Sequence, residues 1–215
     1  MKHPQQQQRS NINHYLKAFH LKCRESLKRH HHRTPEQRRI ETAPRAAMTP
    51  TIHCVRHAQG VHNLTVANHT MHDPLLTPLG EEQCRKLQKD FPAMKEVDLV
   101  VASPLKRTIH TALLGFEPAI QEKKLTIIGM PELQETSDLP CDTGSAPEEI
   151  AKHFEGKPLD LQLVKPGWNS KRMKWAPTAP AIEKRARDAR QWLMARPEKD
   201  IVVVTHGMLT RLVVW

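Results

Sequence analysis

From residue 51 onward, the hydrophobic positions follow two spacings that alternate along the chain. Short apolar runs, typical of strands buried in a parallel sheet, predict strands at residues 51–55, 98–102, 124–128 and 201–205. Between them, helical spacing predicts helices at residues 77–91, 103–114, 147–153 and 180–195. Strands that alternate with helices predict an α/β fold of three layers, with a mostly parallel central sheet and helices on both of its faces.

Capping residues mark the starts of two of these helices. Thr77 stands directly before Pro78, which predicts Thr77 as the N-cap and Pro78 as the first helical residue. Ser103 stands before Pro104 and is predicted to cap the next helix in the same way. Residues 156–177, rich in Pro, Lys and Trp, predict a long loop.

Positive charge is concentrated before the first predicted strand. Residues 1–47 contain eleven Lys or Arg and three Asp or Glu, so they carry +8 of the chain's net charge of +10. A Gln run at 5–8, a His run at 30–32 and few apolar residues are typical of a disordered segment. We therefore expect a basic, disordered N-terminal extension at residues 1–50 and one folded domain at residues 51–215.

One part of this extension has helical spacing. Its apolar positions, with Lys and Arg among them, are Ile12, Tyr15, Leu16, Phe19, Cys23 and Leu27. A basic amphipathic helix is typical of a mitochondrial presequence or of a segment that lies on an anionic membrane. The alternatives are a solvated tail and translation that starts at Met48. A specific nucleic-acid role is disfavoured, because the extension has one Tyr, one Phe and no binding module.

Composition limits the class of protein further. The 215 residues, 38% hydrophobic, suffice for one sizeable core. No run approaches the ~18 apolar residues of a membrane span, so no span is expected. The four cysteines form no C-x-x-C pair and no secretory signal is recognisable, which favours a reducing, cytoplasmic location. A mitochondrial location is the alternative if residues 1–47 are a presequence.

Two histidines directly follow predicted strands. His57, with Arg56 beside it, comes after the strand at 51–55, and His206 comes after the strand at 201–205. Residues that leave the carboxyl ends of parallel strands line the ligand crevice of an open sheet. An imidazole can accept a phosphoryl group, and an arginine can hold the oxygens around it. Either histidine alone is typical of a structural residue, but together with Arg56 they indicate phosphate chemistry.

Two further segments fit that chemistry. Arg107 lies in the first turn of the helix predicted after Ser103, where backbone N–H groups and the helix dipole favour an anion. Residues 131–145 form a predicted loop with four carboxylates. One carboxyl group there can protonate a departing alkoxide and then activate water, a task typically worth ~10²–10⁴ in rate.

Several motifs, in a fixed order, carry a resemblance to one family. They are Arg56-His57, Asn63, Leu76-Thr77-Pro78-Leu79-Gly80, Ser103-Pro104-Leu105-Lys106-Arg107-Thr108, Leu133-Gln134-Glu135 and Thr205-His206-Gly207. With the predicted elements around them, they make residues 51–215 resemble the histidine phosphatase superfamily, in its phosphoglycerate mutase-like branch. The chain is most similar to fungal members, because of Cys141-Asp142-Thr143-Gly144-Ser145 and Gly167-Trp168-Asn169.

The resemblance implies a role for each matching residue. His57 is implied as the nucleophile that becomes phosphorylated, and Glu135 as the general acid and then the base, with Glu132 and Asp138 as its nearest rivals. His206 is implied as a third catalytic residue, which neutralises charge on the phosphoryl group in the transition state. The residues implied to bind the phosphate are Arg56, Asn63, Arg107 and Gly207. No cofactor and no metal are implied, because the arginines supply the positive charge.

Two features depart from the family's pattern. Ala58-Gln59 stands where the family most often has Gly-Glu, and we expect altered or reduced activity at worst. The chain ends at Trp215, nine residues past His206, where relatives usually continue. This predicts a truncated C-terminus in which apolar residues of the last helix lack their usual cover.

We therefore expect a metal-independent phosphomonoester hydrolase that acts on a phosphorylated small molecule through phosphorylated His57. One alternative is a phosphoglycerate-type mutase, which must keep water out and is disfavoured by the short chain. The other is an inactive pseudo-phosphatase that acts by protein contacts, disfavoured because His57 and His206 are both present. Substrate identity and oligomeric state stay open.

Overall fold

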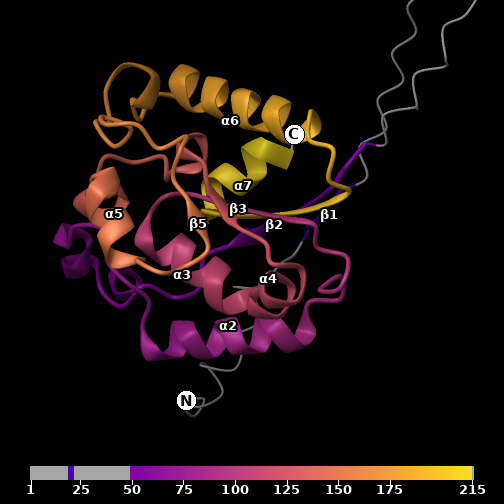
Figure 1. Ribbon diagram of the computed structural model, residues 1–215. Coiled ribbons are helices and arrows are strands. Elements are labelled where there is room, and N and C mark those ends of the chain that lie inside the picture. The colour runs from indigo at the N-terminus through magenta and orange to yellow at the C-terminus, as the bar shows by residue number, and fades with distance from the viewer. Residues whose placement is uncertain (1–18, 22–48, 215) are drawn as a thin grey trace, which may run out of the picture.

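The computed structural model describes residues 19–21 and 49–214, which contain a six-stranded sheet (Figure 1). The strands are β1 (Phe19–Leu21), β2 (Thr51–Arg56), β3 (Leu99–Ala102), β4 (Ile127–Gly129), β5 (Leu159–Asp160) and β6 (Asp200–Thr205). Their order in the sheet is β1-β2-β6-β3-β4-β5. The five strands from β2 to β5 in this order are parallel, and β1 pairs antiparallel with β2. The predicted mostly parallel sheet is confirmed.

Helices cover both faces of this sheet, as predicted. They are α2 (Pro78–Asp90), α3 (Lys106–Gly115), α4 (Glu117–Lys123), α5 (Pro147–His153), α6 (Ala179–Met194) and α7 (Gly207–Val214). In Figure 1, α6 and α7 lie on one face, and α2, α3 and α4 lie on the other. Short 3₁₀ turns occupy parts of the loops: η2 (Val61–Asn63), η3 (Val66–Thr70), η4 (Pro131–Leu133), η5 (Pro140–Asp142) and η6 (Met173–Trp175).

Successive residues of β6 pack into two different cores. Val202 and Val204 belong to the core formed with α2, α3 and α4. Ile201 and Val203 belong to the core formed with α6 and α7. Because both faces of the strand are buried, it is apolar at consecutive positions, which is the pattern that predicted it.

The start of α2 follows the prediction and also holds the loop after β2. Pro78 is the first helical residue, and the Thr77 hydroxyl accepts the N–H of Gly80 at 3.0 Å. The same hydroxyl donates to the side-chain oxygen of Gln59 at 2.8 Å. The side chain of Gln83 accepts the backbone N–H of Gln59, also at 2.8 Å. The beginning of α2 therefore fixes the residue that lies two positions after His57.

The start of α3 differs from the prediction. The helix begins at Lys106, and the N-cap residue, Leu105, makes no side-chain capping bond. The hydroxyl of Ser103 instead lies 3.0 Å from Nε2 of His206. The prediction that Ser103 caps this helix is wrong, because a partner distant in sequence uses the hydroxyl.

The short elements α4 and β5 were not predicted, and the start of β4 was predicted too early in the chain. The seven-residue α4 and the two-residue β5 are too short to produce a recognisable period. Lys124 ends α4 in a left-handed conformation, at φ 52°. The strand predicted from residue 124 therefore begins only at Ile127.

Residues 19–21 of the N-terminal extension also differ from the prediction. Phe19–Leu21 form β1, whereas the spacing of residues 12–27 predicts a helix. The edge of β2 offers unpaired backbone groups, and pairing with them favours a strand over the local helical preference. Residues 1–18 and 22–48 of the extension lie outside the described residues.

Within the part of the chain that the structure describes, no helix combines the length and the apolar character needed to cross a membrane.

Gly80 is required by the close approach of α2 to the loop after β2. A Cβ at this position would lie closer to the carbonyl oxygen of Gln59 than their van der Waals radii allow. Helix propensity alone would make Gly80→Ala stabilising by about 1 kcal/mol. We expect the opposite, a loss of about 1–3 kcal/mol in the free energy of unfolding, because a backbone atom cannot move aside easily.

Urea unfolding of Gly80→Ala measures this loss, with Glu82→Ala on the exposed side of the same helix as the control. The control should unfold within about 0.5 kcal/mol of the wild type. A Gly80→Ala protein as stable as the control would contradict the steric argument.

Candidate active site

The pairing of β2 with β6 brings His57 and His206 together. The two strands are parallel, with Arg56 opposite Thr205, so each histidine leaves the sheet at the same edge. Their ring centroids lie 5.1 Å apart, and the two residues are 2% and 0% exposed. The sequence predicts this meeting of the two histidines, and the sheet register produces it.

Backbone contacts orient the ring of His57. Its Nδ1 lies 2.7 Å from the carbonyl oxygen of Ala58, so Nδ1 carries the proton and donates it. The lone pair of the neutral ring is then on Nε2. Ala58 is itself held, because its N–H donates to the hydroxyl of Thr111 on α3 at 3.1 Å. Ala58 and Gln59, which depart from the family's pattern, are therefore both hydrogen-bonded parts of a fixed loop.

Both histidines are neutral in this environment. Burial lowers the pKa of His57 well below 6.5, and the positive charges of Arg107 and Arg56 lower it further. Burial followed by the charge of Arg107 also lowers the pKa of His206 well below 6.5. A neutral imidazole has the lone pair that a nucleophile needs, so the predicted role of His57 is chemically available at neutral pH.

Arg107 is the buried cation at the centre of the site. It lies on the first turn of α3 and is 0% exposed. Its guanidinium donates to the carbonyl oxygen of Cys141 at 2.5 Å and to the carboxylate of Asp142 at 2.9 Å. A third contact, at 3.3 Å, reaches Nδ1 of His206. The Nε atom of Arg107 is buried without a hydrogen-bond partner.

The contact with Arg107 defines the tautomer of His206. A guanidinium can only donate, so Nδ1 of His206 accepts and its Nε2–H donates to the hydroxyl of Ser103. In this arrangement His206 is an acceptor that orients Arg107. The role implied by the family, direct neutralisation of phosphate, stays a prediction.

Asp142 was not predicted as a site residue. Its carboxylate pairs with Arg107 and also accepts the hydroxyl of Ser137 at 2.6 Å. It belongs to the segment whose pattern indicates fungal members of the family, but nothing in that pattern shows its partner. An ion pair across 35 positions becomes visible only in the folded chain.

Arg56 and Gly207 lie against each other. A Cβ at Gly207 would be 3.6 Å from Cδ and 3.7 Å from Nε of Arg56, an ordinary van der Waals separation. Gly207 also begins α7, where backbone N–H groups favour an anion. The two predicted phosphate-binding residues are therefore brought together at the end of the sheet.

Glu135 is the carboxylate that faces His206. Its Oε2 lies 3.6 Å from Nδ1 of His206, and its Oε1 accepts the N–H of Thr136 at 2.8 Å. Glu132 instead pairs with the exposed Lys174 at 2.8 Å, and Asp138 is exposed. Of the three candidates considered for the general acid, the geometry favours Glu135.

The segment that carries Glu135 is anchored from two sides. Arg185 of α6, 1% exposed, donates to the carbonyl oxygens of Glu132 at 3.1 Å and Gln134 at 3.0 Å. The side chain of Gln134 donates to the carbonyl oxygen of Trp168 at 2.7 Å. Buried hydrogen bonds of this kind hold the Glu135 segment in a defined position.

Asn63 and His62 belong to the turn after His57. The side-chain oxygen of Asn63 accepts the N–H of Gly60 at 3.0 Å, so Asn63 shapes the turn and retains its NH₂ group for a ligand. His62 was not predicted. Its ring lies 5.5 Å from that of His57, and burial lowers its pKa to about 4.

Within residues 19–21 and 49–214, no group of three or more His, Cys, Asp or Glu residues is arranged to hold a metal ion. The positive charge near His57 comes from Arg56 and Arg107.

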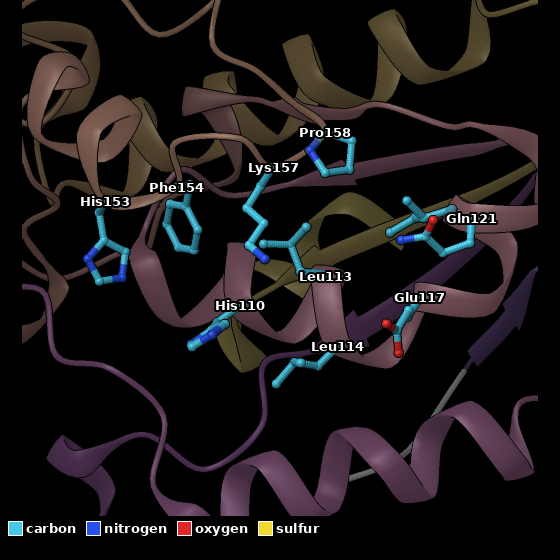
Figure 2. Close-up of a pocket in the computed structure, with 10 residues that line it drawn as sticks. His110, Leu113, Leu114, Glu117, Gln121, His153, Phe154, Lys157 and Pro158 are labelled. Atoms are coloured by element: carbon cyan, nitrogen blue, oxygen red, sulfur yellow. The ribbon is translucent and has the colours of Figure 1, made fainter.

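A separate cavity of about 200 Å³ lies between α3, α4 and the turn after α5 (Figure 2). Apolar side chains, among them Leu113 and Phe154, and the polar side chains of His110, Glu117 and Lys157 line it. None of its lining residues is a predicted site residue. The helix α3 therefore contributes Arg107 to the site and His110 to a different hollow.

Comparison with known proteins identifies a single family. The model of the histidine phosphatase superfamily (branch 1) matches residues 52–215. A protein of Schizosaccharomyces pombe named as a probable phosphatase is 32% identical over 164 residues, covering 75% of this chain and 76% of its own. A phosphoglycerate mutase-like protein of Arabidopsis thaliana is 30% identical over 194 residues, covering 73% and 70%.

A solved structure shares the fold. The ecdysone phosphate phosphatase of Bombix mori, in complex with tungstate, superposes with a TM-score of 0.56 at 19% identity, covering 76% of this chain and 75% of its own. The fold and the resemblance predicted from the sequence are therefore confirmed.

The buried histidines predict how stability depends on pH. His57, His62 and His206 have lowered pKa values, so below about pH 6.5 the unfolded chain binds protons that the native protein does not. Protonation then favours the unfolded chain. Between about pH 7.5 and 5.5 we expect the free energy of unfolding to fall by about 1.4 kcal/mol for each of the three.

Urea unfolding at a series of pH values measures this dependence. In His62→Asn one of the three contributions is removed, so the fall should be smaller by about 1.4 kcal/mol. Stability that does not change, or that rises on acidification, would show that these histidines are not buried in neutral form.

Proposed function

The chain belongs to the histidine phosphatase superfamily, and on this basis we propose that it hydrolyses phosphomonoesters through a phosphohistidine formed on His57. The observation that carries the proposal is that three groups lie around His206: the neutral ring of His57, the buried cation of Arg107 and the carboxylate of Glu135. The phosphatase names of two relatives support hydrolysis as the general activity.

In the first step, the lone pair on Nε2 of His57 attacks the phosphorus of the substrate. A nitrogen–phosphorus bond forms, and the bond from phosphorus to the alcohol oxygen breaks. Glu135, in its protonated form, gives its proton to the departing oxygen, which leaves as the alcohol. Arg56 and Arg107 stabilise the charge on the remaining phosphoryl oxygens.

In the second step, water takes the place of the alcohol. The Glu135 carboxylate, now deprotonated, accepts a proton from the water as its oxygen attacks the phosphohistidine. The nitrogen–phosphorus bond breaks, inorganic phosphate leaves, and the neutral ring of His57 is restored. A mutase would instead transfer the phosphoryl group to a hydroxyl of its substrate, so the acceptor distinguishes the two activities.

The phosphoenzyme is the decisive intermediate. After brief mixing with p-nitrophenyl phosphate, intact-mass spectrometry should show one acid-labile phosphoryl group on the wild type and none on His57→Asn, because the amide is not a nucleophile. His62→Asn, which alters the neighbouring ring, should still become phosphorylated. A folded wild type without the adduct, or an adduct that persists in His57→Asn, would contradict the proposal.

Glu135→Gln separates the two steps. The p-nitrophenolate group leaves without protonation, so phosphorylation should proceed, whereas attack by water loses its base and should slow by about 10²–10⁴. The phosphoenzyme should therefore accumulate and be visible by rapid quench. Asp138→Asn, which changes an exposed carboxylate in the same segment, should turn over normally. Normal turnover by Glu135→Gln would transfer the acid–base role to another group.

A further inference from the structure

The loop that follows β5 is anchored against the active site. The indole N–H of Trp168, 1% exposed, donates to the carbonyl oxygen of Ser145 at 3.1 Å. The side chain of Asn169 donates to the carbonyl oxygen of Gly144 at 2.6 Å. Gln134 binds the backbone of the same loop, as described above. The next residues along the loop are therefore held beside Glu135.

Lys171 is the residue that this anchoring directs inward. Its backbone is left-handed, at φ 54°, a conformation that side chains other than glycine rarely adopt and that costs of order 1–3 kcal/mol. Its half-buried ammonium group donates to the carbonyl oxygen of Glu135 at 3.1 Å. The surrounding hydrogen bonds thus hold a cation next to the general acid.

Lys171, Arg185 and Arg107 form a group of three cations that faces two carboxylates, Asp142 and Glu135. Burial lowers the pKa of Lys171 to about 8, and nearby arginines add to that effect. The charged and titratable groups that face it from the surrounding elements are Arg185, Asp142, Glu135, Arg107 and His206. One of the two carboxylates, Asp142, is already paired with Arg107. An additional anion would therefore be favourable beside Lys171.

The position of Lys171 indicates which part of a substrate it meets. Glu135 protonates the departing oxygen in the proposed reaction, so the alcohol portion must lie on the Glu135 side of the phosphorus. Lys171 is bound to the backbone of Glu135, whereas the cations with the largest effect on His57 are Arg107 and Arg56.

We propose that Lys171 binds a second anionic group, a carboxylate or a phosphate, on the alcohol portion of the substrate. This inference rests on the proposed hydrolysis through His57 and adds a substrate class to it: phosphomonoesters whose alcohol is itself an anion. An ammonium group is a compact charge that can bind either kind of oxyanion.

Pairs of substrates that differ by one carboxylate test the proposal. The substrates are phenyl phosphate and 2-, 3- and 4-carboxyphenyl phosphate. In each variant, kcat/KM for a carboxylated substrate is divided by kcat/KM for phenyl phosphate. Comparison of this ratio between variants cancels the intrinsic reactivity of the substrates. In Lys171→Met the ratio for the best carboxylated substrate should fall about tenfold or more, the effect of losing a charge-assisted contact. Lys171→Arg should retain the ratio within about threefold.

Lys165→Met is the matched control, because it removes an exposed charge from the same loop. Its ratio should equal that of the wild type. If Lys171→Met lowered kcat/KM equally for phenyl phosphate and for the carboxylated substrates, Lys171 would only support the Glu135 segment. That result would overturn the proposal. An unchanged ratio in Lys171→Met would overturn it as well.

Raising the pH provides a second readout. In the wild type the ratio should fall as pH rises through about 8, because Lys171 loses its proton while the carboxylate stays ionised. In Lys171→Arg the ratio should stay constant over this range, since a guanidinium remains charged. A fall of the same size in Lys171→Arg would assign the titration to another group and count against Lys171.

Binding separates this inference from the proposed reaction. Benzylphosphonate and its carboxylated forms cannot be hydrolysed, so calorimetry reports their affinities even if His57 is never phosphorylated. The carboxylated forms should bind about tenfold more tightly to the wild type than to Lys171→Met, with little change for benzylphosphonate itself. Equal affinities would refute the subsite, whereas a missing phosphoenzyme would refute only the reaction.

Discussion

The burial of the Arg107 guanidinium is the constraint on which the site depends. A fully buried cation is costly unless charge and hydrogen bonds compensate it. Asp142, the carbonyl oxygen of Cys141 and Nδ1 of His206 provide that compensation. These contacts tie the start of α3 to the loop after β4 and to the end of β6. Burial keeps the ring of His57 neutral and the charge of Arg107 adds to this effect, so the buried cation contributes both to the scaffold and to the state of the proposed nucleophile.

A second set of buried contacts positions Glu135, the proposed general acid. Glu135 is on an irregular segment with no helix or strand of its own, so its place depends on its neighbours. Arg185 of α6 donates to the carbonyl oxygen of Gln134, the residue before Glu135. Lys171, from the loop that follows β5, donates to the carbonyl oxygen of Glu135. Both contacts come from cations with lowered pKa values. The Glu135 carboxylate, catalytic in the proposed reaction, is thus placed by groups that also give its surroundings a positive charge.

Local patterns in the sequence predicted much of the fold. The apolar runs of β2, β3 and β6 indicated strands buried on both faces, and Thr77 with Pro78 gave the start of α2. The errors have physical causes. Ser103 has the right residue type for a cap, but its hydroxyl is bound to His206. The helix α4 is too short for a period, and Phe19–Leu21 gain more from pairing with β2 than from local helical preference.

By itself, the sequence determined the strands, the longer helices and the residues with reactive side chains, because these depend on spacing and chemical type over a few neighbouring positions. Only the tertiary structure decided which polar groups meet. The pairing of Arg107 with Asp142, the anchoring by Arg185 and the inward position of Lys171 join residues 34 or more positions apart in the chain. The sheet register and the need to compensate buried charge determine these partners, and no local sequence pattern indicates either of them.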